Sequence, residues 1–303
     1  MRNRRHRPRA AVAAATAVLL GATAIAACDA SGGNSPAPKG PSAHDKPSPK
    51  PTPTWDTDPK SLAAVGDSIT RGFDACSVLA DCPEASWATG TDSEVRSLAT
   101  RLLGKERAAG HSWNYAKTGA RMADLTGQVE QAALKRPELV TVMAGANDAC
   151  RPSADSMTPV AEFRADFEEA MRTLRRELPK TQVYVTSVPD LKRLWSQGRT
   201  NALGKQIWKL GICSSMLADP DDLDTSATQR RATVQGRVVA YNDVLKDVCA
   251  KDLRCRYDGG AVFDYRFDGD QLSPWDWFHP SKDGQSRLAE LAYRQVKAKD
   301  PGA

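Results

Sequence analysis

The sequence predicts an α/β fold in which helices cover both faces of a central parallel sheet, as a three-layer α/β/α sandwich. Short apolar or β-branched runs alternate with amphipathic segments between residues 60 and 299, and such alternation is typical of parallel sheets. The composition, 41% hydrophobic and 26% charged, provides enough apolar residues for one large core. We therefore expect one domain over residues 60–299, followed by a short tail at 300–303.

Five runs rich in apolar and β-branched residues are expected to form the strands of this sheet. They occupy residues 62–66, 112–116, 139–145, 182–188 and 254–258. In open parallel sheets, functional groups gather outside the carboxyl ends of the strands. The residues that directly follow each run are therefore the first candidates for a functional site.

The helical pattern is clearest between Pro159, which suits a first turn, and Pro179, which cannot continue a helix. Large apolar residues recur there every three or four positions, at Val160, Phe163, Phe167, Met171, Leu174 and Leu178. A last helix is expected from about Ser281, with an apolar face made of Leu288, Leu291, Ala292 and Val296.

The charge of the chain is concentrated at its start. Five arginines among the first nine residues account for the whole net charge of +5, so the remaining chain is close to neutral. This excludes a basic nucleic-acid-binding body, which would need clustered Lys and Arg. The uncharged, Ala-rich run at 10–27 completes the layout of a secretory signal over residues 1–27. A transmembrane helix is the alternative, because the run is about long enough to span.

Residues 28–59 are expected to be a linker. Eight prolines occur between residues 29 and 59, among Ser, Gly, Thr and Lys, with almost no large apolar side chains. Such a segment cannot bury enough surface to fold, and its prolines keep it extended. We interpret it as a stalk that holds the domain away from a membrane.

The cysteines are typical of an exported protein. Apart from Cys28 there are six, and an even number in an exported chain indicates disulfides. Two pairs share the same short spacing, which favours the pairing Cys76–Cys82, Cys249–Cys255 and Cys150–Cys213. A zinc site is the alternative, but neither a C-x-x-C pair nor a nearby histidine supports it.

A candidate nucleophile follows the first strand, in the turn Gly66-Asp67-Ser68. A helix cap is the simpler explanation of this turn, because Asp and Ser are both preferred there. Catalysis would in addition require a base and donors for an oxyanion.

Histidine positions indicate the base by elimination. His6 lies in the signal and His44 in the stalk, while His111 immediately precedes the second strand and so enters the sheet at the wrong edge. His279 remains, and Asp276 lies three residues before it, close enough to orient the imidazole as in a Ser–His–Asp arrangement. A capped turn at the start of a helix would explain this pair equally well.

Two further turns offer oxyanion donors. Gly119 follows the second strand, where a glycine lets its backbone N–H approach a substrate oxygen. Asn147 follows the third strand and provides an amide side chain. With the N–H of Ser68, these groups would make three donors.

Ser68, Gly119, Asn147 and His279 occur in this order, each beside a predicted element. The arrangement resembles the SGNH hydrolases, also called the GDSL lipases and acylhydrolases, over roughly residues 60–298; the first block reads GDSIT here. The resemblance implies a flavodoxin-like fold and ester hydrolysis without metal or cofactor. It also implies Ser68 as nucleophile, Gly119 and Asn147 as oxyanion donors and Asp276 with His279 as the acid–base pair. By the same resemblance Asp67 has no catalytic role, and we expect it to cap or brace the turn.

A second resemblance concerns the N-terminus, where residues 25–28 (Ile-Ala-Ala-Cys) are similar to the lipobox of bacterial lipoproteins. It implies a diacylated Cys28, which would anchor the chain to the outer face of a cell membrane. We expect a secreted or membrane-anchored monomer without a nucleic-acid partner.

The substrate class is indicated less directly. The segments Asn147–Cys150 and Phe278–Ser281 look like the phospholipase B branch of the family, which favours lipid or phospholipid esters. Aromatic residues near the expected site could line an acyl groove or stack on a sugar, so removal of acyl groups from glycans is the alternative. A non-catalytic surface-binding module on the same fold is a further alternative.

Overall fold

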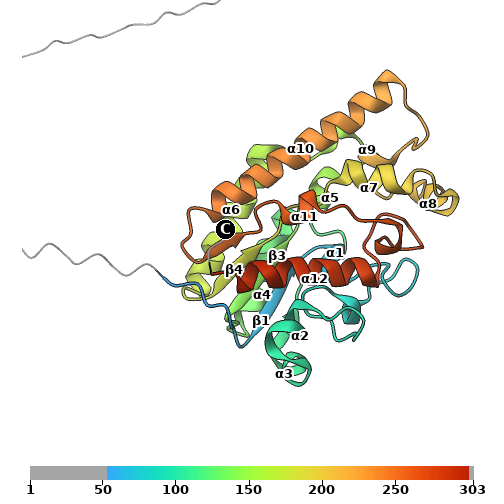
Figure 1. The fold of residues 1–303 in the computed structure, drawn as a ribbon. Coiled ribbons are helices and arrows are strands. Elements are labelled where there is room, and N and C mark those ends of the chain that lie inside the picture. Colours follow the sequence, from blue (N-terminus) through green and yellow to red (C-terminus); the bar gives the residue numbers. More distant parts are fainter. Residues whose placement is uncertain (1–52, 300–303) are drawn as a thin grey trace, which may run out of the picture. The chain divides into compact units, whose positions relative to one another are not determined.

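The computed structural model describes residues 53–299. The expected signal, the expected acylation site Cys28, most of the expected linker and the tail lie outside these residues. The central sheet has five strands, all parallel, in the order β2-β1-β3-β4-β5 (Figure 1). This is the 2-1-3-4-5 order of flavodoxin-like folds. The strands are β1 (Leu62–Gly66), β2 (Ser112–Asn114), β3 (Leu139–Met143), β4 (Gln182–Val185) and β5 (Cys255–Tyr257).

Helices cover both faces of this sheet, as expected for a three-layer α/β fold. The first group, whose members pack against one another on one face, is α4 (Leu125–Ala133), α6 (Val160–Glu177) and α10 (Thr225–Cys249). The other face is covered by α2 (Leu98–Leu103) and α12 (Lys282–Lys297), and α12 crosses in front of the sheet in Figure 1. Shorter helices form the connections: α1 (Ser68–Arg71), α3 (Lys105–His111), α5 (Ala146–Ala149), α7 (Leu191–Gly198), α8 (Ala202–Trp208), α9 (Ser214–Leu217) and α11 (Ala261–Asp264).

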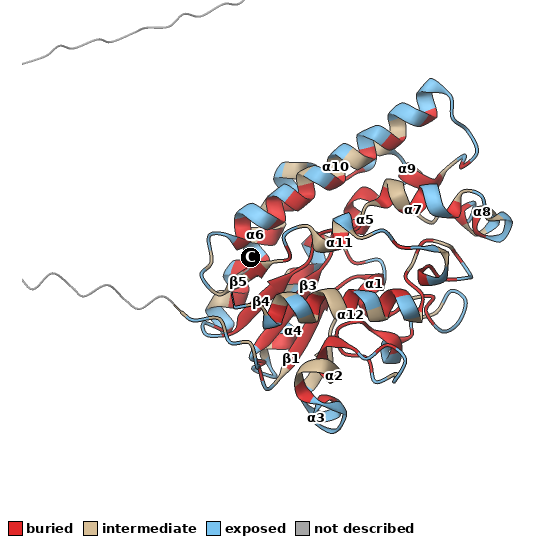
Figure 2. Ribbon diagram, in the orientation of Figure 1, coloured by how far each residue is buried: buried red, intermediate tan, exposed pale blue. Residues whose placement is uncertain are grey.

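The core lies between the two helical layers and the sheet, whose strands β1 and β3 are buried along their whole length (Figure 2). The apolar runs at 112–116, 139–145 and 182–188 continue beyond the strands that they form. Ala116, Ala144 and Val188 are buried under the loops at the carboxyl edge without pairing in the sheet, so the apolar pattern overestimates strand length there.

Two helices follow the pattern closely. Helix α6 begins after Pro159 and ends before Leu178, and its buried face includes Phe163, Phe167 and Leu174. Helix α12 begins at the residue after Ser281, whose side chain accepts a hydrogen bond from the N–H of Gly284 at 3.3 Å.

The last residues of the expected linker pack on the domain. The indole Nε1 of Trp55 donates to the carbonyl of Val296 at 2.9 Å, and the guanidinium of Arg256 lies 4.2 Å from the centroid of its ring. The side-chain amide of Gln182 donates to the carbonyl of Asp56 at 2.9 Å. Contacts with the domain therefore begin at Trp55, several residues before the expected boundary at residue 60.

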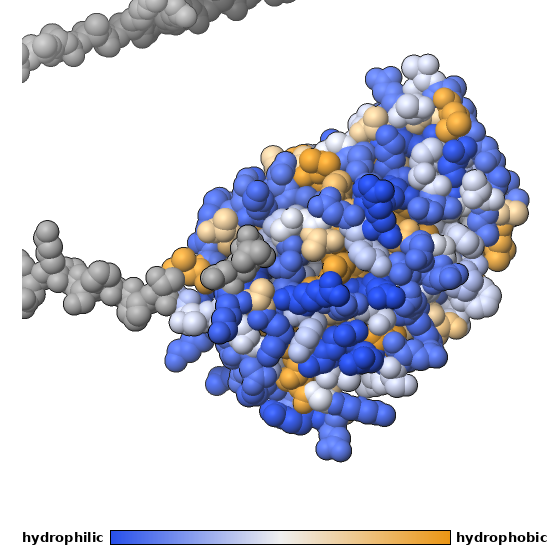
Figure 3. Space-filling model, viewed as in Figure 1, coloured by the Kyte–Doolittle hydropathy of each residue, from blue (hydrophilic) through white to orange (hydrophobic). Residues whose placement is uncertain are grey.

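Three disulfides join Cys76 to Cys82, Cys150 to Cys213 and Cys249 to Cys255, the pairing that the spacing favours. The face of the domain in Figure 3 is mainly hydrophilic, with scattered apolar side chains. Between residues 53 and 299 we find no helix that is both long and apolar enough to cross a membrane.

Candidate active site

The turn after β1 presents Ser68 as the first residue of helix α1. Gly66 has a φ of +150°, and a Cβ atom there would lie 2.1 Å from the carbonyl oxygen of Met143, so only glycine fits. Asp67 caps the helix through a hydrogen bond from the N–H of Ile69 to its Oδ1 at 3.0 Å. Asp67 thus has the capping role that the sequence predicts.

Side-chain amides from distant elements hold this turn in place. Gln128 of α4 accepts from the N–H of Gly66 at 2.7 Å and donates to its carbonyl at 3.0 Å. Gln285 of α12 donates to the carbonyl of Ile69 at 2.9 Å, and Asn114 of β2 donates to that of Thr70 at 2.9 Å. Three elements therefore fix the backbone that carries Ser68, and no local pattern in the sequence reveals these contacts.

The candidate base comes from the turn that precedes α12. Asp276 Oδ1 accepts the backbone N–H groups of Phe278 and His279, both at 2.9 Å, so its carboxylate shapes the turn. Its other oxygen, Oδ2, lies 2.5 Å from His279 Nδ1. The far side of the imidazole, Nε2, lies 2.9 Å from Ser68 Oγ. The structure thus brings Ser68, His279 and Asp276 into one hydrogen-bonded chain, although Ser68 and His279 are 211 residues apart.

The electrostatics of this chain suit proton transfer. Burial works to lower the pKa of His279, but the charge and hydrogen bond of Asp276 outweigh it, and the pKa is raised above the ordinary value of 6.5. Burial works to raise the pKa of Asp276, but His279 and the backbone N–H donors hold it below its usual value. Asp276 therefore stays ionised, and its charge would stabilise an imidazolium at His279.

The two expected oxyanion donors lie beside Ser68. Gly119 has a φ of +82°, which a glycine adopts readily, and it lines the same pocket as Ser68 and Asn147. One N–H of the Asn147 amide donates to the carbonyl of Ala120 at 2.9 Å. This bond orients the amide, and its second N–H is available to a substrate oxygen.

These residues surround a pocket of about 210 Å³. The walls beyond the catalytic groups are mainly apolar and come from Ile69, Ala146, Leu191, Leu194, Ile212 and Phe278, together with the Cys150–Cys213 disulfide. Residues 191–217, which follow β4 and include α7, α8 and α9, supply one side of the pocket; we call this segment the cover.

Residues 62–292 match the family model described as GDSL-like Lipase/Acylhydrolase. The matched range contains the Gly-Asp-Ser turn, the turns of Gly119 and Asn147 and the Asp276–His279 pair, and it spans most of the chain.

The chain belongs to the GDSL-like lipase/acylhydrolase family.

Solved structures with low sequence identity resemble this GDSL-like chain. An alpha/beta hydrolase enzyme from the metagenome of Lake Arreo has 18% identity and a TM-score of 0.48, covering 79% of this chain and 97% of its own. A lipase from a goat rumen metagenome has 13% identity and a TM-score of 0.48, and the match covers 80% of this chain and 98% of the lipase. A family two carbohydrate esterase from Clostridium thermocellum has 16% identity and a TM-score of 0.43, covering 82% and 65%. A search of curated proteins finds no match.

Most aromatic residues near the site of this GDSL-like protein belong to the core. Trp87 is fully buried, and Trp277 packs its ring against Gly204 of the cover and Gly269. Phe278 does line the pocket. Trp208 has a role that its position in the sequence does not reveal, because its indole N–H donates to the carbonyl of Asp276 at 2.6 Å.

His111 lies exposed at the end of α3, where Nδ1 is 3.1 Å from the carbonyl of Arg107. It enters β2 from the amino edge, as expected, and takes no part in the site. One buried carboxylate beside the triad, that of Asp74, was not among the residues expected from the sequence.

Proposed function

We propose that the chain is a serine ester hydrolase that cleaves carboxylic acyl esters through an acyl-enzyme on Ser68. The observation that carries the proposal is the continuous chain from Ser68 Oγ through His279 to Asp276, with spacings of 2.9 and 2.5 Å, at the wall of an apolar pocket. A nucleophile, a base and an orienting acid within hydrogen-bond reach are what acyl transfer requires.

The reaction would proceed in two steps. His279 removes the proton of Ser68 as Oγ attacks the ester carbonyl, and the oxyanion forms among the N–H groups of Ser68 and Gly119 and the amide of Asn147. The resulting imidazolium, held by Asp276, protonates the leaving alcohol. His279 then activates a water molecule, which releases the acid and restores Ser68.

The walls of the pocket beyond the triad are mainly apolar, which favours the acyl group of the substrate, rather than a polar group, as the part that the pocket encloses. Lipid or phospholipid esters are our first candidate substrates. Leu210 of the cover is 69% exposed and directly precedes Gly211, which lines the pocket, and such a side chain favours contact with a lipid surface. The likeness of Asn147–Cys150 and Phe278–Ser281 to the phospholipase B branch points the same way.

Pocket size favours a second candidate, the removal of short acyl groups from glycans. A volume of about 210 Å³ lies below the range of about 300–1,000 Å³ that is usual for ligand pockets. A short acyl chain would fill it, whereas a long one would have to extend along the surface.

The first experiment compares the wild type with Ser68→Ala. We expect the wild type to react with a fluorophosphonate probe and to hydrolyse p-nitrophenyl esters, and the variant to lose at least about 1,000-fold in kcat/KM with little change in Tm. Activity in a folded Ser68→Ala variant would remove Ser68 from its role. A folded wild type that neither reacts nor hydrolyses would instead be a binding module.

Acyl preference separates the two substrate classes. Esters with acyl chains of increasing length, a phospholipid in vesicles and an acetylated sugar are compared by kcat/KM. Preference for vesicles and longer chains supports the lipid esterase, and preference for acetyl groups on sugars supports the glycan esterase.

A further inference from the structure

A second buried carboxylate stands beside the catalytic pair. Asp74 and Asp276 are both 0% exposed. A carboxylate oxygen of Asp74, a carboxylate oxygen of Asp276 and a ring nitrogen of His279 all lie within 4.8 Å of one another. The mechanism above uses Asp276 and His279 but gives Asp74 no part.

If both carboxyl groups are ionised, one carboxylate oxygen of this cluster has no hydrogen-bond donor. Asp276 receives three donors, from the backbones of Phe278 and His279 and from His279 Nδ1. Asp74 Oδ1 accepts the N–H of Leu79, whereas its Oδ2 is buried without an N–H or O–H donor among the described residues. Two adjacent carboxylates in a dry site do not both ionise easily, and a proton held between them satisfies both.

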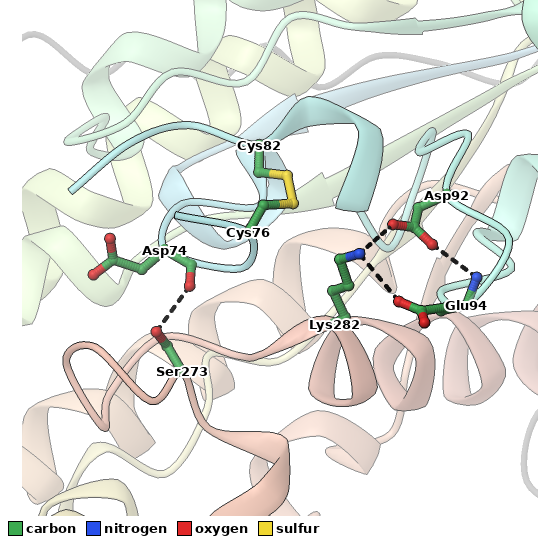
Figure 4. Close-up of a disulfide and its surroundings, with 7 residues drawn as sticks. All are labelled: Asp74, Cys76, Cys82, Asp92, Glu94, Ser273 and Lys282. Atoms are coloured by element: carbon green, nitrogen blue, oxygen red, sulfur yellow. Dashed lines mark hydrogen bonds and ion pairs between the residues drawn. A yellow bond between two sulfur atoms is a disulfide. The ribbon is translucent and has the colours of Figure 1, made fainter. Parts of the chain in front are cut away.

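The backbone holds Asp74 in this position by several independent contacts. Its carbonyl accepts the hydroxyl of Ser273 at 2.8 Å, which ties it to the segment that carries Asp276 (Figure 4). Its N–H donates to the carbonyl of Ala80 at 3.0 Å, within the loop closed by Cys76 and Cys82. The φ of Asp74 is +59°, a conformation that Asp and Asn tolerate better than most residues.

We propose that Asp74 is a positioning residue whose carboxyl shares a proton with that of Asp276 and thereby sets how readily His279 accepts the proton of Ser68. The inference rests on the proposed function, since it concerns the same triad. When Asp74 keeps the proton, it donates to Asp276 and the carboxylate dyad carries a single negative charge. When the proton is lost, a second charge faces the imidazole and holds its proton more tightly.

The surrounding charges agree with this coupling. Burial, followed by the charge and hydrogen bond of Asp276, raises the pKa of Asp74 to about 6. After burial and Asp276, the groups that act on the pKa of His279 are Asp74 and Asp67, and both raise it. Phe73 and Phe278 cover the imidazole, with ring centroids 5.0 and 5.5 Å away, and limit screening by water.

The test is Asp74→Asn, which keeps the size, the acceptor for Leu79 and a donor for Asp276 but cannot ionise. We expect kcat/KM within about threefold of the wild type at pH 8–9, and an acidic limb of the pH–rate profile that moves down by about one pH unit. Asp81→Asn is the matched control, because Asp81 lies in the same disulfide loop, is partly exposed and pairs with Arg71, and an asparagine there keeps the acceptor for the hydroxyl of Thr118. Its profile should not move.

A titration of His279 by NMR gives a readout that does not depend on any substrate. Assignment by comparison with a His279→Gln variant identifies its signals, and the pKa of the imidazole should fall in Asp74→Asn and stay constant in Asp81→Asn. Retained activity in a folded Ser68→Ala variant would contradict the proposed function. The titration of His279 would still report whether Asp74 and the imidazole are coupled. An unchanged imidazole pKa in folded Asp74→Asn would defeat the coupling alone.

Two other results would also overturn the inference. A folded Asp74→Asn variant that is inactive at every pH would show that an ionised carboxylate is required at this position. A wild-type profile that moves on treatment with EDTA would show that a cation, rather than a proton, lies between the two carboxyl groups.

Discussion

The aspartate next to the nucleophile combines a helix cap with a buried charge. Asp67 is 1% exposed, its Oδ1 caps α1, and its Oδ2 has no hydrogen-bond donor among the described residues. Burial raises its pKa to about 7, although the N–H of Ile69 and the charge of His279 act in the opposite direction. Ionisation of Asp67 therefore destabilises the folded chain.

This sign leads to a prediction for Asp67→Asn, which keeps the cap and removes the charge. Because the pKa of Asp67 is raised in the folded state, protonated Asp67 makes its full contribution to wild-type stability below about pH 4. This contribution is lost as the pH rises through about 7. Stability of the variant relative to the wild type should increase between pH 5 and 7, by at most about 1.4 kcal/mol per pH unit. Denaturant unfolding at several pH values measures it.

The exposed cap Asp224 offers a matched control for that comparison. It accepts the N–H of Ala227 at 2.7 Å at the start of α10, and this bond lowers its pKa. Asp224→Asn should therefore become less stable relative to the wild type as the pH rises through the acid range. If the stability of both variants relative to the wild type increased with pH, the effect would not be specific to a buried charge.

Among the elements, the cover determines the shape of the pocket and is attached at several points. The Cys150–Cys213 disulfide joins it to the turn that carries Asn147, and Trp208 binds the carbonyl of Asp276. The guanidinium of Arg231 in α10 stacks 4.2 Å from the ring centroid of Trp195. The cover is thus linked both to the turn that carries Asn147 and to the turn that carries Asp276 and His279.

Removal of the Cys150–Cys213 disulfide by a double serine variant should affect both stability and binding. The bond closes a loop with a sequence separation of 63, for which chain entropy gives a loss of about 4 kcal/mol. Because both cysteines line the pocket, KM for p-nitrophenyl esters should rise as well.

The corresponding double serine variant at Cys249 and Cys255 serves as its control. These residues have a sequence separation of 6 and do not line the pocket, so the expected loss is about 2 kcal/mol with KM unchanged. Equal changes in KM for the two variants would mean that the cover does not shape the site. Unfolding and steady-state kinetics measure both quantities.

For the whole molecule, the N-terminal segments suggest where the domain works. We propose that Cys28 is acylated after export and that the proline-rich linker holds the domain away from the membrane. Cys28→Ser should move the protein from the detergent phase to the aqueous phase in a Triton X-114 partition, because two or more acyl chains anchor a protein stably.

Activity provides the control for the anchoring prediction. The proposed catalytic groups all lie between residues 68 and 279, so kcat/KM for a small soluble ester should stay unchanged in Cys28→Ser. Identical partition of the wild type and the variant would contradict acylation at this residue.

Local patterns predicted the elements of the fold and the three residues that form the hydrogen-bonded chain Ser68–His279–Asp276. Alternating apolar runs indicated a parallel α/β sheet, and Pro159 and Pro179 bracketed α6. The only histidine in a suitable position was His279, and the turn around Ser68 could be recognised because glycine, a capping Asp and a nucleophile are neighbours in the chain. Information of this kind lies within a few consecutive residues, so the sequence determines it.

Tertiary structure alone decided which distant groups meet. Gln128, Gln285 and Trp208 brace the catalytic turns, and Asp74 lies beside Asp276, yet none of these residues has a neighbour in sequence that indicates its partner. A buried polar group needs a partner wherever the fold places it, and the partner depends on how the helices and loops pack on the sheet. The sequence therefore determined the elements and the residue types of the site, and packing determined how those residues are held and which charges they share.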